Sequence, residues 1–183
     1  MALSEEQLRT LVGQCEQFRD ARAPGGYPAS LALCIIDSVQ STGVTYTSVG
    51  NVVDRYRAYR RAQGGRPETD GAAELMATFD ELGGPDGWAR EIGNGNKTST
   101  RPGAPLKAAA IHLAVLALAA EGITSAELLR DAAVETETAR RVRAAWRKVP
   151  GQRSGITWHY VQMLAGVPGV KPDRMIIRFV ANA

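Results

Sequence analysis

The chain has few cysteines and no long apolar segment. Its 183 residues include two cysteines, Cys15 and Cys34, too few for a disulfide framework and not spaced for a zinc or iron–sulfur site. The longest apolar run, residues 108–120, contains His112 and is too short to span a bilayer. No apolar stretch follows a basic N-terminal start. We therefore expect a reducing, cytoplasmic setting (nucleoid-associated in a bacterium), no metal, no cofactor and no membrane partner.

Charge is nearly balanced overall but unevenly distributed. The chain has 22 Lys and Arg against 19 Asp and Glu, a net charge of +3, which does not by itself indicate nucleic-acid binding. Residues 130–178 hold ten of the basic residues and only four acids, by count along the printed sequence. The C-terminal third is therefore the electropositive part of the chain.

Strand signals are almost absent, whereas helical periodicity recurs between clusters of turn-forming residues. The sequence therefore predicts an all-α fold, either one domain over residues 1–183 or two closely packed helical sub-domains with a cleft between them. The segment 28–40 is apolar nearly all round, which indicates a central buried helix. Residues 93–103 lack periodicity and indicate an exposed loop. Helices are expected at 4–21 (with Leu8, Leu11, Val12, Cys15 and Phe18 on one face), 28–40, 45–63, 69–82, around Trp88, and at 105–120, 124–134, 135–148, 154–165 and 172–182.

Two turns in the last quarter of the chain carry the strongest functional signal. Residues 149–155 (VPGQRSG) open one predicted helix and residues 171–174 (KPDR) open another. Pro172 suits a first helical position, so Asp173 is expected in the first turn, where the helix dipole favours its ionised form. Such a carboxylate can stabilise a sugar cation or orient a water molecule. An ordinary acid at a helix N-terminus is the alternative interpretation.

The order and spacing of several short segments carry a family resemblance. Pro150-Gly151 is followed by Gly166, Asp173 and residues 176–178 (IIR), and residues 36–42 (IDSVQST) come upstream. In this order the chain resembles the helix–hairpin–helix DNA glycosylase superfamily (HhH-GPD, endonuclease III-like) over about residues 28–183. Residues 93–97 are weakly similar to a further segment of that family.

The resemblance implies a partner, a reaction and a set of site residues. Hairpin amides would bind a phosphate of double-stranded DNA, a damaged or mismatched base would be flipped out, and Asp173 would assist cleavage of the N-glycosidic bond in a monomeric protein. Asp37 and Trp88 would line the base pocket, although structural roles are the alternative for both. Lys171 and Arg174 could contact a strand or be solvated surface charges. The residues expected to contact DNA are Gly151, Arg153, Ser154, Gly155, Gln40, Lys171 and Arg174.

Three departures from the family pattern limit the expected chemistry. Gly155 stands where bifunctional members carry the nucleophilic lysine, so hydrolysis without lyase activity is expected. Arg153 replaces the second hairpin glycine and resists positive φ. The C-terminal four-cysteine cluster is missing, so no iron–sulfur cluster is expected. Two alternatives stay open: a catalytically silent DNA-binding protein of the same fold, and a helical interaction protein without a nucleic-acid role.

Overall fold

The computed structural model describes residues 4–20, 25–171 and 174–182. Within these ranges the regular structure consists of ten α-helices and two short 3-10 helices, with no strand, so the all-α prediction is confirmed. The α-helices are α1 (Glu5–Cys15), α2 (Leu31–Gln40), α3 (Tyr46–Ala62), α4 (Ala72–Glu81), α5 (Pro85–Glu91), α6 (Lys107–Ala120), α7 (Ala126–Val134), α8 (Thr136–Lys148), α9 (Ile156–Leu164) and α10 (Arg174–Ala181). In the described part of the chain, none of them has the length and apolar content needed to cross a membrane.

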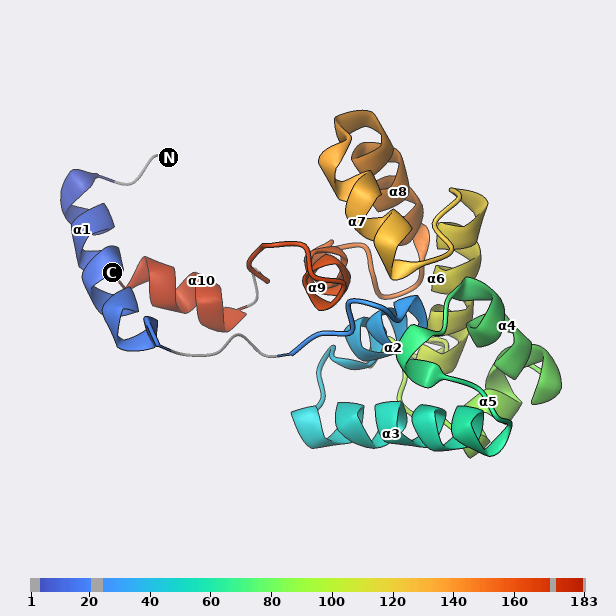
Figure 1. Cartoon of the computed structure of the whole chain (residues 1–183). Coiled ribbons are helices and arrows are strands. Elements are labelled where there is room, and N and C mark those ends of the chain that lie inside the picture. Colours follow the sequence, from blue (N-terminus) through green and yellow to red (C-terminus); the bar gives the residue numbers. More distant parts are fainter. Residues whose placement is uncertain (1–3, 21–24, 172–173, 183) are drawn as a thin grey trace.

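Helix α2 is the centre of the main group of helices (Figure 1). All ten of its residues are buried, and it packs against α3, α4, α6 and α9. The helix begins after Ser30, whose hydroxyl accepts a hydrogen bond from the Leu33 amide at 3.3 Å. A helix that is apolar on all sides has no face for solvent. The central position predicted for residues 28–40 is therefore confirmed.

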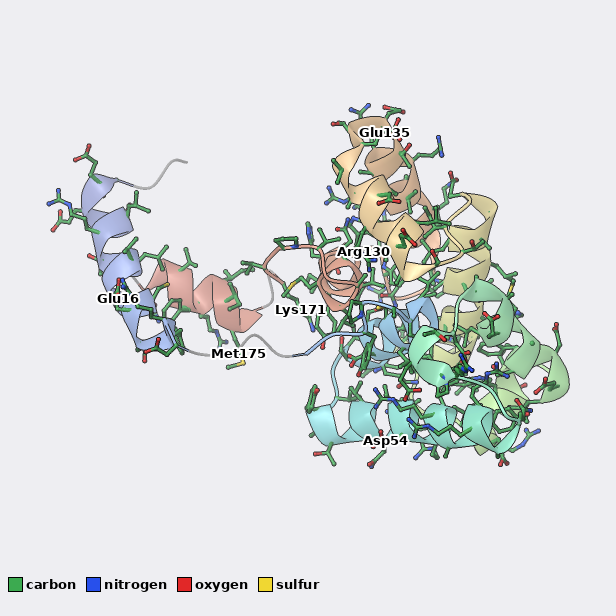
Figure 2. All side chains as sticks on the ribbon, in the orientation of Figure 1. Glu16, Asp54, Arg130, Glu135, Lys171 and Met175 are labelled. Atoms are coloured by element: carbon green, nitrogen blue, oxygen red, sulfur yellow. The ribbon has the colours of Figure 1, made fainter. Side chains whose placement is uncertain are left out.

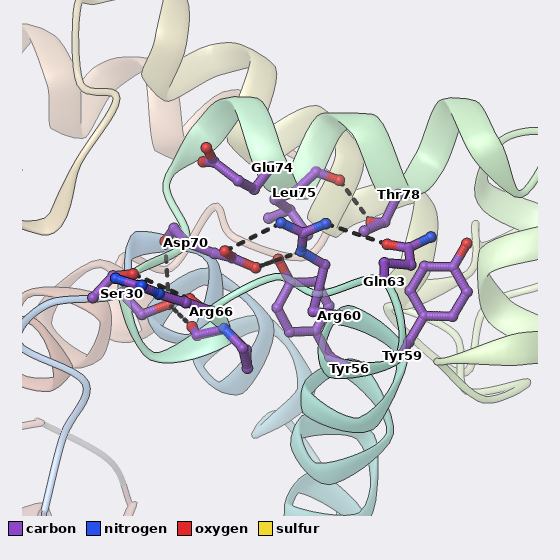
Figure 3. Close-up of polar contacts among 12 residues, drawn as sticks. Ser30, Tyr56, Tyr59, Arg60, Gln63, Arg66, Asp70, Glu74, Leu75 and Thr78 are labelled. Atoms are coloured by element: carbon purple, nitrogen blue, oxygen red, sulfur yellow. Dashed lines mark hydrogen bonds and ion pairs between the residues drawn. The ribbon is translucent and has the colours of Figure 1, made fainter.

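A polar network joins α3 to the starts of α2 and α4 (Figure 3). The buried carboxylate of Asp70 accepts hydrogen bonds from the Tyr56 hydroxyl at 2.8 Å and from Arg60 Nε at 2.7 Å. The backbone carbonyl of Asp70 accepts a third hydrogen bond, from the Ser30 hydroxyl at 3.1 Å. This network also explains why α4 begins at Ala72 rather than at the expected residue 69: residues 67–69 form a 3-10 turn that directs Asp70 inward.

Helices α1 and α10 lie beside each other, away from the main group (Figure 1). The rings of Phe18 and Phe179 meet edge to face at 6.1 Å. The expected helix over residues 4–21 ends at Cys15 and continues only as a 3-10 turn over residues 16–18; residue 21 lies outside the described residues. No residue of α1 is buried, and Leu8 and Val12 are 52% and 54% exposed. The apolar face of α1 is therefore largely uncovered.

Candidate functional site

The turn between α8 and α9, residues 149–155, is held by its own backbone. The Gln152 amide donates to the Val149 carbonyl at 3.0 Å, and the Gly155 amide donates to the Gln152 carbonyl at 3.1 Å. Gly151 and Gly155 have φ angles of 81° and 79°, in the left-handed region that glycine adopts without strain. We call this segment the hairpin.

Three amides of the hairpin have no hydrogen-bond acceptor within the described part of the chain. Among the described residues, the N–H groups of Gly151, Arg153 and Ser154 donate no hydrogen bond to the protein, and all three residues are exposed. The neighbouring loop packs against the same turn, because a Cβ atom at Gly151 would lie 2.9 Å from Cβ of Thr98. Free amides in a turn at a helix start are suited to binding an anion.

Several cations near the hairpin have no carboxylate partner among the described residues. Arg147 Nε donates to the Arg153 carbonyl at 2.9 Å, and a Cβ atom at Gly155 would lie 3.7 Å from Nη2 of Arg143. The ion pairs of α8 use its first arginines, Arg140 with Glu137 and Arg141 with Glu121. In the part of the chain that the structure describes, no carboxylate pairs with Arg143, Arg147, Lys148 or Arg153. The hairpin therefore lies in a positive electrostatic field.

A second group of polar side chains surrounds Asp37 on α2. Asp37 is 2% exposed, and its Oδ2 accepts a hydrogen bond from the Tyr27 hydroxyl at 2.9 Å. Burial raises the pKa of Asp37, while the hydroxyls of Tyr27 and Tyr160 and the charge of Lys171 act in the opposite direction. One oxygen of this interior acid thus has a hydrogen-bond partner, whereas Oδ1 is buried without one among the described residues.

Lys171 contacts residues of the Asp37 group and the end of α2 rather than extending into solvent. Its Nζ lies 4.1 Å from the centroid of the Tyr160 ring and 3.3 Å from the Ser41 hydroxyl. Figure 2 shows Lys171 beside α9, where the described chain approaches α10. The residue immediately before Pro172 and Asp173 is therefore fixed against α9 and the end of α2. Asp173 itself and the side chain of Arg174 lie outside the described residues.

A cleft of about 570 Å³ lies next to the Asp37 group. Its walls are mainly apolar and include Tyr46, Tyr160, Met163, Val167 and Pro168. Asp37 is not among the lining residues, whereas Tyr160, whose hydroxyl favours the ionised form of Asp37, is one of them. The burial of Asp37 in α2 and its bond to Tyr27 agree with the structural alternative, and its role as a pocket residue stays a prediction.

The structure places two further predicted site residues in the interior. Gln40 is 1% exposed: Lys107 Nζ donates to its carbonyl at 2.8 Å, and Asn94 Nδ2 donates to its side-chain Oε1 at 3.5 Å. Trp88 is fully buried, stacks on Phe79 at 5.0 Å and donates to the Thr78 hydroxyl at 3.1 Å. In this conformation neither side chain is available to a DNA duplex or to an extruded base. The burial of Trp88 agrees with the packing alternative, and the DNA-contacting roles of both residues stay predictions.

Lys107 is a charged residue that the sequence prediction missed. It is 2% exposed, and its Nζ donates to the carbonyls of Gln40 at 2.8 Å and Thr42 at 2.6 Å. The sequence feature that could have revealed it is a single lysine at the start of the apolar helix expected over residues 105–120. Among the described residues, no group of three or more His, Cys, Asp or Glu is placed to hold a metal ion.

These features define an all-helical protein whose candidate interface is a basic helix–turn–helix junction. The chain belongs to the family described as Domain of unknown function (DUF8548), whose profile matches residues 8–183. The match spans the hairpin, the Asp37 group and α10. Comparison with curated proteins and with solved structures found no match.

Proposed function

We propose that this protein binds duplex DNA through the hairpin and acts as a monofunctional DNA glycosylase of the helix–hairpin–helix type. The observation that carries the proposal is the set of free N–H groups of Gly151, Arg153 and Ser154, surrounded by unpaired cations. Backbone amides and cations together are the groups that proteins use to hold a DNA phosphate.

In the backbone conformation of the hairpin, Arg153 is no obstacle to phosphate binding, although the sequence suggested that it could be. Arg153 stands where the family pattern has glycine, and a side chain there would resist a positive φ. Among the described residues only glycines have positive φ, and in the hairpin these are Gly151 and Gly155. Arg153 is therefore free of backbone strain, and its guanidinium adds charge next to the amides. The substitution is compatible with phosphate binding.

Asp173 would assist the chemical step. Cleavage of an N-glycosidic bond develops positive charge on the sugar, which a nearby carboxylate stabilises, or which a water molecule oriented by it captures. Lys171, two residues earlier, fixes the preceding chain against Tyr160 and Ser41. Gly155 offers no amine, so the nucleophile would be water and no Schiff base would form.

The proposal requires no iron–sulfur cluster. Both cysteines of this sequence lie in its N-terminal part, Cys15 at the end of α1 and Cys34 buried in α2. A C-terminal four-cysteine cluster would therefore have no ligands in this sequence. The fold assignment to the helix–hairpin–helix glycosylases is part of the same proposal.

The burial of Gln40 and Trp88 favours a second candidate function. With neither side chain available to an opened duplex, the protein could bind DNA without excising a base. The two candidates share the hairpin and differ only in the release of a base.

A base-release assay on duplexes carrying damaged or mismatched bases tests the proposal. We expect release by the wild type and by Asp131→Asn, a matched change of an exposed acid on α7, and loss of release in Asp173→Asn with DNA affinity retained. Equal release by wild type and Asp173→Asn would remove Asp173 from the mechanism. Salt-dependent DNA binding with no release from any duplex would establish the silent DNA-binding candidate.

A further inference from the structure

A polar cleft of about 430 Å³ lies between the turn that follows α2 and the loop that precedes α6. It is separate from the apolar cleft near Tyr160, since the two share no lining residue. Its lining contains no Asp or Glu. The charged and hydroxyl-bearing residues of the lining are Thr42, Lys97, Thr98, Ser99, Thr100 and Lys107.

Lys107 places a nearly buried positive charge at this cleft. Burial lowers the pKa of Lys107 to about 8, and no carboxylate pairs with its ammonium group among the described residues. Its Nζ donates to two carbonyls at the C-terminal end of α2, those of Gln40 and Thr42. An ammonium group has three N–H donors, so one is left after these bonds.

The end of α2 balances only part of this charge. A helix C-terminus carries roughly half an elementary negative charge, so about half of the lysine charge remains uncompensated. Buried charges in proteins are normally paired with an opposite charge. Capping of α2 therefore explains two hydrogen bonds of Lys107 but leaves part of its charge unbalanced in a residue that lines the cleft.

The remaining lining adds donors and a second cation. Lys97 is exposed, and in the described part of the chain the hydroxyls of Thr98 and Thr100 make no hydrogen bond. Two lysines and free hydroxyls without any carboxylate form a donor set that matches the oxygens of a phosphate group.

We propose that this cleft, anchored by Lys107, binds a phosphate group. The group belongs either to a nucleic-acid strand or to a small phosphorylated molecule. The assignment of the phosphate to a nucleic-acid strand rests on the proposed function. Thr98 packs directly on Gly151 of the hairpin, so a strand held by the hairpin amides passes close to the cleft.

Amide NMR spectra recorded during titration test the proposal with two probes, inorganic phosphate and a short oligothymidylate. We expect saturable shifts of the amides of residues 95–100 with phosphate. Thr100→Glu places a carboxylate in the cleft from an exposed loop position, and we expect a Kd about tenfold higher, equivalent to one lost charge-assisted hydrogen bond. Lys107→Met is expected to have the same effect.

The matched control is Thr136→Glu on α8, next to Glu135, which Figure 2 shows at the tip of the α7 and α8 pair. It should bind phosphate like the wild type. Tighter binding of the oligothymidylate at residues 95–100 assigns the cleft to a strand, and binding of phosphate alone assigns it to a small molecule. No saturable shift at residues 95–100 with either probe, or equal affinity in wild type and Thr100→Glu, overturns the proposal. Because Thr98 contacts Gly151, the amides of Arg153 and Ser154 report on the hairpin and those of residues 95–97, 99 and 100 report on the cleft, so the two proposals fail independently.

Discussion

Replacement of Ser154 by glutamate should block the hairpin without unfolding the protein. Ser154 is exposed, and its hydroxyl accepts only a long hydrogen bond of 3.4 Å from the Ile156 amide. A carboxylate at this position would lie among the free amides of Gly151 and Arg153, where the proposal places a DNA phosphate. It would occupy that position and repel the phosphate.

Ser154→Glu should change two properties of DNA binding, the Kd and its dependence on salt. A hydrogen bond to a charged group contributes about 1.5–3 kcal/mol, so the loss of one raises the Kd for DNA at least about tenfold. The added carboxylate offsets one positive charge beside the phosphate, so the magnitude of the slope of log K against log salt falls by about 0.9. Stability should move little, because a carboxylate near the start of α9 gains about 0.3–1 kcal/mol from the helix dipole.

Fluorescence anisotropy with a labelled duplex over a series of salt concentrations measures both quantities, and urea unfolding measures stability. Thr136→Glu, at the start of α8, makes the same change far from the hairpin and should bind DNA as the wild type does, apart from a small nonspecific effect of net charge. If Ser154→Glu has the affinity and salt slope of Thr136→Glu, the hairpin amides do not hold a phosphate.

Three further predictions concern stability. Gly151→Ala forces a side chain into a φ of 81° and should cost about 2 kcal/mol in unfolding free energy; an unchanged urea midpoint would contradict this. Asp70→Asn removes the carboxylate that pairs with the partly buried Arg60 and should cost about 3 kcal/mol, seen as a lower melting temperature; a variant as stable as wild type would show that the ion pair contributes nothing. Burial and a neighbouring carboxylate raise the pKa of Tyr27 and Tyr160 above the usual 10.0, so the unfolded chain loses these protons first. Stability should therefore fall as the pH rises above about 10, and less so in the double Tyr→Phe variant; equal pH dependence of the two proteins would refute the assignment.

Local patterns were sufficient to predict most of the helices. The segment that forms α2 is apolar nearly all round, which predicted its central position, and Thr45 caps the start of α3 by accepting a hydrogen bond from the Ser48 amide. The turn at Pro150-Gly151 could also be predicted, because glycine ends helices and permits a positive φ. These features depend on residues that are close in sequence.

Properties that depend on contacts between residues distant in the chain could not be predicted from the sequence. Gln40 is buried where Lys107, 67 positions later, contacts the last turn of α2, and Trp88 is buried by its stacking on Phe79. The sequence suggested strain at Arg153, but the two glycines on either side of it take the positive φ angles. The polar cleft at Lys107 depends equally on two loops that are far apart in the chain.

The central claim is that the hairpin amides hold a phosphate of DNA. Amide NMR spectra recorded while a duplex is added report on each N–H group separately. The account predicts that the signals of Gly151, Arg153 and Ser154 move together and saturate, at a DNA concentration that rises with salt. Saturable DNA binding that shifts other amides and leaves these three unchanged would contradict it.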